Sequence, residues 1–135
     1  MPLLAANVLI CEVVLNEKSD LASAIRILNV LTVSPTENTA TFKVQTMLTA
    51  TPGDFQQHIV KVWMRTIQNN LVVAKAPEFR FVFGNKFDYS GPGGFSLTTN
   101  FALDLRTLGA LGHYMIVVSL DGEVVAQTPL MLRRG

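Results

Sequence analysis

The chain is poor in cysteine and in charged side chains, and both shortages exclude classes of protein. Its 135 residues include one cysteine, Cys11, so no internal disulfide can form and a disulfide-stapled secreted scaffold is excluded. Charged residues make up 16% of the chain, against about 25% in an ordinary soluble domain, so we expect part of its apolar surface to face a partner. The net charge is +1 with both signs scattered. Without a basic stripe to neutralise phosphates, we expect no nucleic-acid partner.

We expect neither a secretion signal nor a membrane span in this sequence. Residues 1–15 are apolar, but they lack a basic n-region, and Glu12 interrupts the run. A membrane-spanning helix needs about 20 apolar residues, which this segment does not reach. We therefore expect a buried strand here, a cytoplasmic protein and no association with a membrane.

Motifs that carry catalysis or bind metals are also lacking. His58 and His113 stand singly, and no HExxH, CxxC or paired-histidine spacing is present. The glycine-rich residues 90–94 lack the lysine and the helix of a phosphate-binding loop. Cys11 lies in an apolar run, where burial makes a thiol inert, so a nucleophile paired with either histidine is disfavoured. We predict no catalytic residue, no metal and no cofactor, and hence not an enzyme.

The chain does contain a series of short apolar runs separated by turn residues, which is typical of a β-sandwich or barrel. The runs cover residues 3–15, 23–33, 40–50, 55–67, 71–75, 79–83, 95–105, 113–120 and 123–132. They predict one all-β domain over residues 1–135, an immunoglobulin-like two-layer antiparallel β-sandwich of nine strands, or eight if 71–83 form one bent strand. The predicted core contains Phe42, Val44, Phe81, Phe101, Leu103 and Ile116.

Residues 55–67 are compatible with two kinds of secondary structure. Apolar residues recur there at helical spacing, and Asp54 is a suitable helix cap. The stretch also alternates and is rich in β-branched residues, so we predict a strand. Trp63 then lies between Lys61 and Arg65 on one face, which is either a solvated surface or a binding platform.

An Asp-Gly pair at 121–122 lies between two apolar runs and is the strongest short hairpin signal in the chain. A two-residue turn there sets Val118 opposite Val125. The large side chains on one face of the hairpin are then suited to cover the core. The other face carries smaller apolar residues: Met115, Val117, Val124 and Ala126.

That second face is the predicted interface. Leaving it in water would forfeit burial worth about 25 cal/mol per Å². We predict a homo-oligomer, most simply a two-fold dimer, that uses this face. A covering loop of the same chain is the alternative. Under the first reading, Val117→Lys breaks the oligomer and leaves a folded monomer.

The long glycine-rich loop at 84–94 is a second candidate surface. Its mixture of aromatic and charged residues is typical of binding loops. The predicted contact residues are Lys86, Phe87, Asp88 and Tyr89. Aspartates in turns suggest a calcium site only if they share one end of the sandwich, and strand parity leaves this open. These aspartates are Asp20, Asp54, Asp88 and Asp121.

The segment before the last hairpin carries a corner pattern. Residues 108–112 predict a compact apolar turn before Tyr114. The Tyr114 hydroxyl would then bond the backbone of that turn, as the corner tyrosine of immunoglobulin-like domains does. An ordinary strand tyrosine fits the sequence equally well. Together with residues 5–12 and 120–126, this segment resembles a family of small bacterial proteins of unknown function, considered immunoglobulin-like or C2-like β-sandwiches. The resemblance implies that fold and no catalytic residues.

Two functions remain open on these grounds. The first is a non-catalytic structural or protein-interaction module that self-associates. The alternative is a ligand-binding β-sandwich that takes a sugar or Ca²⁺ through the 84–94 loop and one end of the sandwich.

Overall fold

Strands are the only regular secondary structure in the part of the chain that the structure describes. The computed structural model describes residues 3–16, 22–34, 36–50, 56–83, 93–106 and 111–135, with backbone alone at 4, 12–16, 22–28 and 93. The strands are β1 (Leu3–Asn16), β2 (Ala22–Leu28), β3 (Val30–Val33), β4 (Thr39–Ala50), β5 (Gln57–Thr66), β6 (Val72–Lys75), β7 (Phe79–Val82), β8 (Gly93–Asp104), β9 (Gly112–Leu120) and β10 (Glu123–Arg134). No helix in these ranges is long and apolar enough to cross a membrane.

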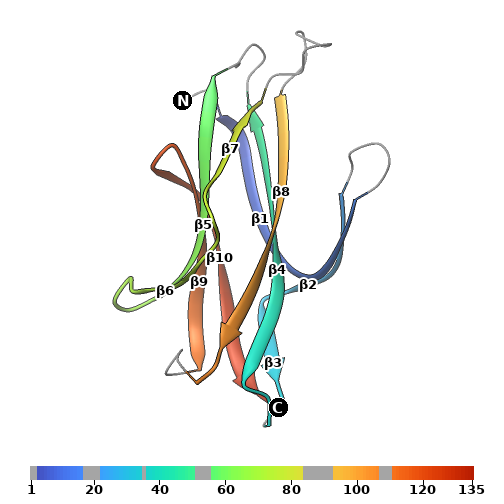
Figure 1. The fold of residues 1–135 in the computed structure, drawn as a ribbon, viewed down its shortest axis with the longest axis vertical. Coiled ribbons are helices and arrows are strands. Elements are labelled where there is room, and N and C mark those ends of the chain that lie inside the picture. Colours follow the sequence, from blue (N-terminus) through green and yellow to red (C-terminus); the bar gives the residue numbers. More distant parts are fainter. Residues whose placement is uncertain (1–2, 17–21, 35, 51–55, 84–92, 107–110) are drawn as a thin grey trace.

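The strands form two sheets that pack face to face (Figure 1). One sheet has the order β2-β1-β4-β8 and is antiparallel throughout. The other has the order β3-β10-β9-β5-β6, and β7 also pairs with β5. In this six-stranded sheet β3 runs parallel to β10, so the sheet is mixed. The prediction of an all-β fold with two packed sheets is confirmed.

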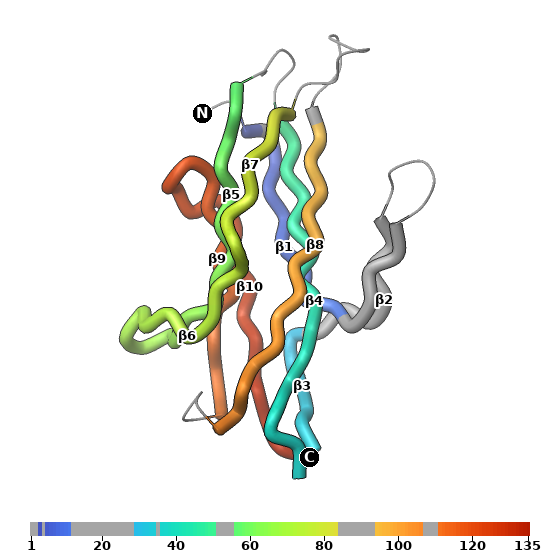
Figure 2. The backbone as a smooth tube through the Cα atoms, viewed as in Figure 1, coloured from blue at the N-terminus to red at the C-terminus, as the bar shows by residue number. Residues whose placement is uncertain are grey.

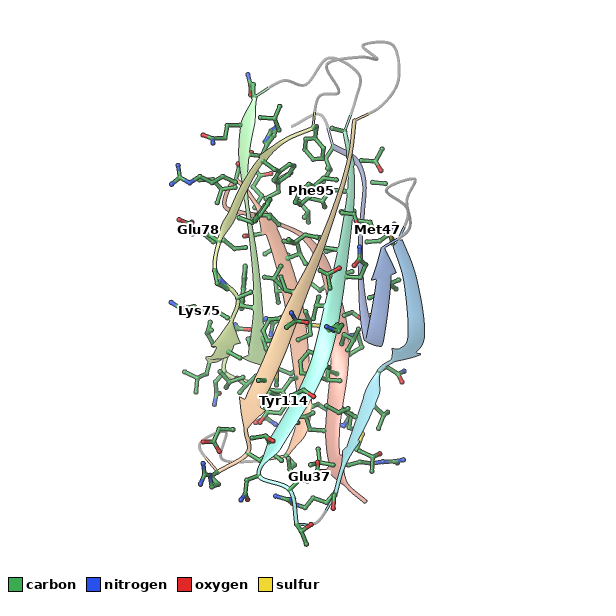
Figure 3. All side chains as sticks on the ribbon, turned by 45° about the vertical axis from the view of Figure 1, so that its right-hand side comes forward. Glu37, Met47, Lys75, Glu78, Phe95 and Tyr114 are labelled. Atoms are coloured by element: carbon green, nitrogen blue, oxygen red, sulfur yellow. The ribbon has the colours of Figure 1, made fainter. Side chains whose placement is uncertain are left out.

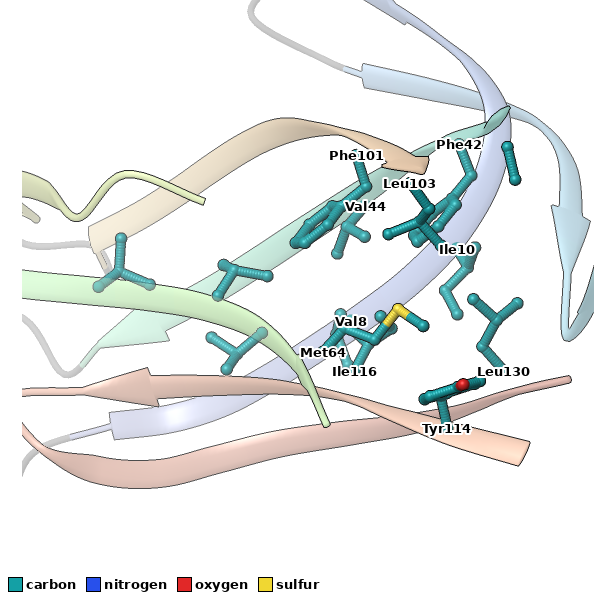
Figure 4. Packing of buried hydrophobic residues seen from close by; sticks show 14 of the residues in the cluster. Val8, Ile10, Phe42, Val44, Met64, Phe101, Leu103, Tyr114, Ile116 and Leu130 are labelled. Carbon is teal, nitrogen blue, oxygen red and sulfur yellow. The ribbon is translucent and has the colours of Figure 1, made fainter. Parts of the chain in front are cut away.

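The core lies between the sheets and draws on both. Phe42 and Phe101 stack across the β4–β8 pair with ring centroids 5.3 Å apart, and Met64 and Ile116 face them from the six-stranded sheet (Figure 4). All six residues predicted for the core are buried in this one cluster. Alternation explains the success, because successive side chains of a strand point to opposite faces. On β4, Phe42 and Val44 point inward and Lys43 outward, as expected.

The prediction of eight or nine antiparallel strands is wrong in one place. The run 23–33 is not one strand, because it breaks at Asn29 into β2 and β3. β2 stays beside β1, whereas β3 crosses to the second sheet and lies parallel to β10. There the Met131 N–H donates to the carbonyl of Asn29 at 2.9 Å. The crossing gives the described part of the chain ten strands and its parallel pair.

Residues 57–66 form strand β5, which confirms the strand and excludes the helix. A turn at 67–70 follows, and Asn70 has φ 54°, the positive value expected of an asparagine in a tight turn. Thr66 closes the turn: its N–H donates to the Leu71 carbonyl at 2.9 Å, and its hydroxyl accepts from the Leu71 N–H at 3.0 Å. The hairpin of β5 and β6 extends sideways from the body of the sandwich (Figures 1 and 2).

The last hairpin forms where predicted, with Asp121 at φ 50° and Gly122 at φ 86°. The register predicted for this hairpin is wrong beyond the first pairs of residues. A β-bulge between Val124 and Ala126 sets Val118 opposite Ala126 instead of Val125. Since one extra residue shifts all later partners and exchanges the faces, the predicted faces of β10 are wrong from this point onward.

Candidate functional site

The predicted interface lies on the outer face of the six-stranded sheet, and the bulge removes one of its members. Ala126 packs against the core, so its placement beside Val117 is wrong. Val117 stays on the outer face but is only 1% exposed within a single chain. Val124 is 52% exposed, and Met115 is half-buried. Only Val124 and Met115 of the predicted set therefore remain accessible to a partner.

Side chains of the neighbouring strands cover Val117. It is the cross-strand partner of Trp63 on β5 and of Gln127 on β10. Arg65 donates from Nη2 to Oε1 of Gln127 at 3.1 Å, which carries its side chain over β9. Arg65 also donates from Nη1 to the Thr66 carbonyl at 3.0 Å. Val117 is thus covered by side chains of neighbouring strands in its own sheet, which is a different cover from the loop foreseen as the alternative.

Beside this cover lies a pocket of about 430 Å³ at the edge of the sheet. It is lined by Lys61, Val62, Trp63, Val72, Lys75, Ala76, Pro77 and Glu78. Trp63 is the cross-strand partner of Lys75, so indole and ammonium share the outer face. The Ala76 N–H donates to the Val62 carbonyl at 2.9 Å, and this hydrogen bond fixes the segment after β6, which lines the pocket, against β5.

The tip of the β5–β6 hairpin exposes large apolar side chains. Leu71 is 62% exposed, Val72 50% and Ile67 44%. β6 is also the last strand in the sheet order, so among the described residues no strand pairs with one side of its backbone. We call Ile67, Leu71 and Val72 the hairpin tip. Such a group of apolar residues at a sheet edge is typical of a contact surface.

A histidine and a carboxylate meet near the opposite end of β5. His58 is buried, and its Nδ1 lies 2.6 Å from Oδ2 of Asp121 in the last hairpin. The other carboxylate oxygen accepts the Ile59 N–H at 2.9 Å, and the Asp121 N–H donates to the Ile59 carbonyl at 2.9 Å. His58 also packs on Phe83, with ring centroids 5.2 Å apart.

Desolvation alone would raise the pKa of Asp121, but the hydrogen bonds from His58 and Ile59, together with the charge of a protonated His58, lower it. Asp121 is therefore a carboxylate that fixes the imidazole and ties the β9–β10 turn to β5. Carboxylate-oriented imidazoles also serve as catalytic bases, which additionally requires a nucleophile in reach. The three contacts of Asp121 with His58 and Ile59 hold the last hairpin against β5. This structural role, which we call the clamp, is sufficient to account for the pair.

The remaining candidates for chemistry lie apart from one another. Cys11 is buried on β1, where burial raises the pKa of its thiol, and the cation of Lys43 offsets this in part. Its Sγ lies 3.8 Å from the Lys43 carbonyl. Cys11 is in the four-stranded sheet, whereas His58 and His113 are in the other. In the described ranges, no three histidine, cysteine, aspartate or glutamate side chains gather as metal ligands.

Several predicted residues lie outside the described ranges. These are the loop contacts Lys86, Phe87, Asp88 and Tyr89 and the turn aspartates Asp20 and Asp54. Tyr114 is described and is buried near the start of β9, where burial raises the pKa of its hydroxyl. The turn proposed to receive that hydroxyl, residues 108–112, includes residues 108–110, which are not described.

Sequence reasoning singled out Trp63 and Lys61 but missed Lys75 and Glu78. The tight turn after Thr66 points to both residues, because the chain that follows such a turn runs back beside β5. The bulge between Met64 and Arg65 shifts the register of that return. The partner of Trp63 therefore does not follow from counting residues around the turn.

No family model matches the chain, and no curated protein matches it. Among solved structures, the chain is similar to Pseudomonas fluorescens alkylpurine DNA glycosylase AlkC bound to DNA containing an abasic site analog, with a TM-score of 0.53 and 14% sequence identity. The match covers 78% of this chain and 28% of that chain, so this chain spans little more than a quarter of its length. At this identity the likeness concerns the fold alone. The resemblance to a bacterial family remains a prediction.

Proposed function

We propose that this domain is an immunoglobulin-like, non-catalytic interaction module that self-associates through the hairpin tip. The order of strands supports the immunoglobulin-like assignment. In such domains, strands G, F and C are neighbours in one sheet, and A, B and E are neighbours in the other. Here β10, β9 and β5 are neighbours in that way, and so are β1, β4 and β8. Tyr114, near the start of the strand in place F, matches the position of a corner tyrosine.

The observation that carries self-association is the exposure of the hairpin tip. Fully burying a Val, Leu or Ile side chain contributes about 1.5–3 kcal/mol, and the three tip residues are 44–62% exposed. Two tips packed together therefore gain roughly 5–9 kcal/mol. Association costs about 4–15 kcal/mol in lost freedom. At the low end of that cost at most about 5 kcal/mol remains, so the dimer is weak, with a dissociation constant of roughly 0.2 mM or higher.

A second copy suits this surface because identical tips meet by a two-fold rotation, the commonest symmetry of soluble oligomers. The strands around the tip carry several cations, so two copies also repel each other. Salt screens such repulsion and strengthens apolar contacts. The dimer is thus expected to become more stable as the salt concentration rises.

Light scattering across a concentration series tests the proposal. The wild-type mass should rise from 14.8 kDa toward twice that value. Leu71→Lys should keep the monomer mass at all concentrations. Val124→Lys is the matched control, because Val124 is 52% exposed on the same sheet but away from the tip, and it should associate as the wild type does. A constant wild-type mass, or equal loss in both variants, would overturn the proposal.

A further inference from the structure

The positive charge of the chain is concentrated on one part of the molecule. Residues 57–82, which form β5, β6 and β7, contain Lys61, Arg65, Lys75 and Arg80 but only one carboxylate, that of Glu78. The whole chain has 11 cations and 10 carboxylates. The rest of the chain therefore has seven cations and nine carboxylates. This edge of the sheet attracts anions although the protein as a whole is nearly neutral.

The pocket beside Trp63 lies within this cationic region. Lys61 and Trp63 are two residues apart on β5 and so point to the same face. Lys75 is the cross-strand partner of Trp63 and shares that face. Lys61 and Lys75 are exposed, and in the described part of the chain neither makes an ion pair with a carboxylate. Both ammonium groups are thus available to a ligand.

Glu78 adds an acceptor to these donors. It lies at the same edge of the molecule as Lys75 (Figure 3) and lines the same pocket. Its Oε1 is 3.9 Å from Nη2 of Arg80, and both side chains are about half exposed. A contact this long and solvated leaves the carboxylate free to accept further hydrogen bonds. The pocket therefore offers an indole face, two cationic donors and one anionic acceptor.

We infer that this pocket binds an acidic carbohydrate, a sugar ring that carries a carboxylate. The apolar face of the ring stacks on Trp63, and the carboxylate accepts hydrogen bonds from Lys61 and Lys75. A ring hydroxyl donates to Glu78. The volume of about 430 Å³ is near the small end of the range for ligand pockets, which suits one or two sugar rings.

Two other anionic partners match the pocket less well. Single-stranded nucleic acid is held by several aromatic platforms along a groove, whereas Trp63 is the one aromatic residue that lines this pocket. The Glu78 carboxylate also disfavours a phosphate backbone. An acidic peptide would satisfy the lysines, but it offers no ring to the indole and few hydroxyl donors to Glu78.

Trp63 is the only tryptophan in the chain and reports on the pocket directly. Its emission is followed while the full chain is titrated with trigalacturonic acid, and in parallel with galactotriose, hexaglutamate and a six-residue oligothymidylate. We expect a saturable change with trigalacturonic acid, and binding at least tenfold weaker for the other three. Raising the salt from about 0.05 to about 0.5 M should weaken binding, the opposite of its effect on the dimer.

The Lys61→Gln, Lys75→Gln double variant should bind trigalacturonic acid at least tenfold more weakly. Lys43→Gln is the matched control, because Lys43 lies on the other sheet and donates to Asn100 at 2.6 Å, and it should bind as the wild type does. The inference is overturned by the absence of saturation, by unchanged affinity in the double variant, or by equal or tighter binding of any of the other three probes. Light scattering tests self-association independently, so failure of one proposal is distinguishable from failure of the other.

Discussion

Two valines on the same outer face of one hairpin differ in exposure by about fiftyfold, which makes them a matched pair. Val117 on β9 is 1% exposed beneath Trp63, Arg65 and Gln127, whereas Val124 on β10 is 52% exposed. Replacing each with alanine removes the same two methyl groups. Any difference in the free energy of unfolding then measures how completely the neighbouring side chains cover Val117.

The expected magnitudes follow from burial. Each buried methylene-sized group contributes about 0.8 kcal/mol, so Val117→Ala loses about 1.6 kcal/mol and a further cost for the cavity left behind. We expect about 2 kcal/mol in total. Val124 is about half exposed and leaves no enclosed cavity, so Val124→Ala should cost roughly 0.5 kcal/mol.

Urea unfolding followed by circular dichroism measures the difference, and Trp63 emission provides a second probe. With an m-value of about 1–3 kcal/mol/M, the two midpoints should lie roughly 0.5–1.5 M apart, with Val117→Ala the lower. The reasoning is refuted if the two variants have the same midpoint. It also fails if Val117→Ala changes the oligomeric mass while leaving the stability unchanged, because Val117 would then face a second copy.

Three further predictions concern single side chains. Because the folded-state pKa of Asp121 is lowered, its stabilising effect is complete above the ordinary value of 3.8 and is lost as the pH falls through the folded pKa. The free energy of unfolding of Asp121→Asn, measured by urea denaturation, should be about 1 kcal/mol lower than that of the wild type at neutral pH and should depend less on acid; equal acid dependence would contradict the clamp. Thr46 is fully buried and its hydroxyl has no hydrogen-bond partner among the described residues, so Thr46→Val should raise the free energy of unfolding by about 1 kcal/mol, and a loss of stability would show that the hydroxyl is satisfied. Cys11 should react with a thiol reagent only after denaturation, since it is buried and its pKa is raised; rapid labelling of the native protein would contradict this.

Local patterns were sufficient for the core and for most strands. Alternating apolar residues placed Phe42, Val44 and Phe101 correctly, because the two-residue period of a strand is a local property. The positive φ of Asp121 and Gly122 followed equally from turn chemistry. Each of these features depends on a few neighbouring residues.

The features that were missed depend on register and on distant contacts. The break at Asn29 and the bulge at Val124–Ala126 each change the pairing of a strand without a distinctive residue to mark the change. His58 and Asp121 are far apart in sequence and meet only because β5 lies beside β9. The outer face of β9 was predicted to be bare because its cover, from Arg65 and Gln127, comes from two other strands.

Hydrogen exchange at the backbone of β6 tests the proposed self-association most directly, since it locates the contact as well as detecting it. We predict that the amides of 71–75 gain protection as the protein concentration rises through the dissociation constant. The opposite edge strand β3 should not change, and Leu71→Lys should abolish the gain at β6. Protection at β6 that is independent of concentration, in a protein whose mass nevertheless doubles, would contradict the hairpin tip as the site of association.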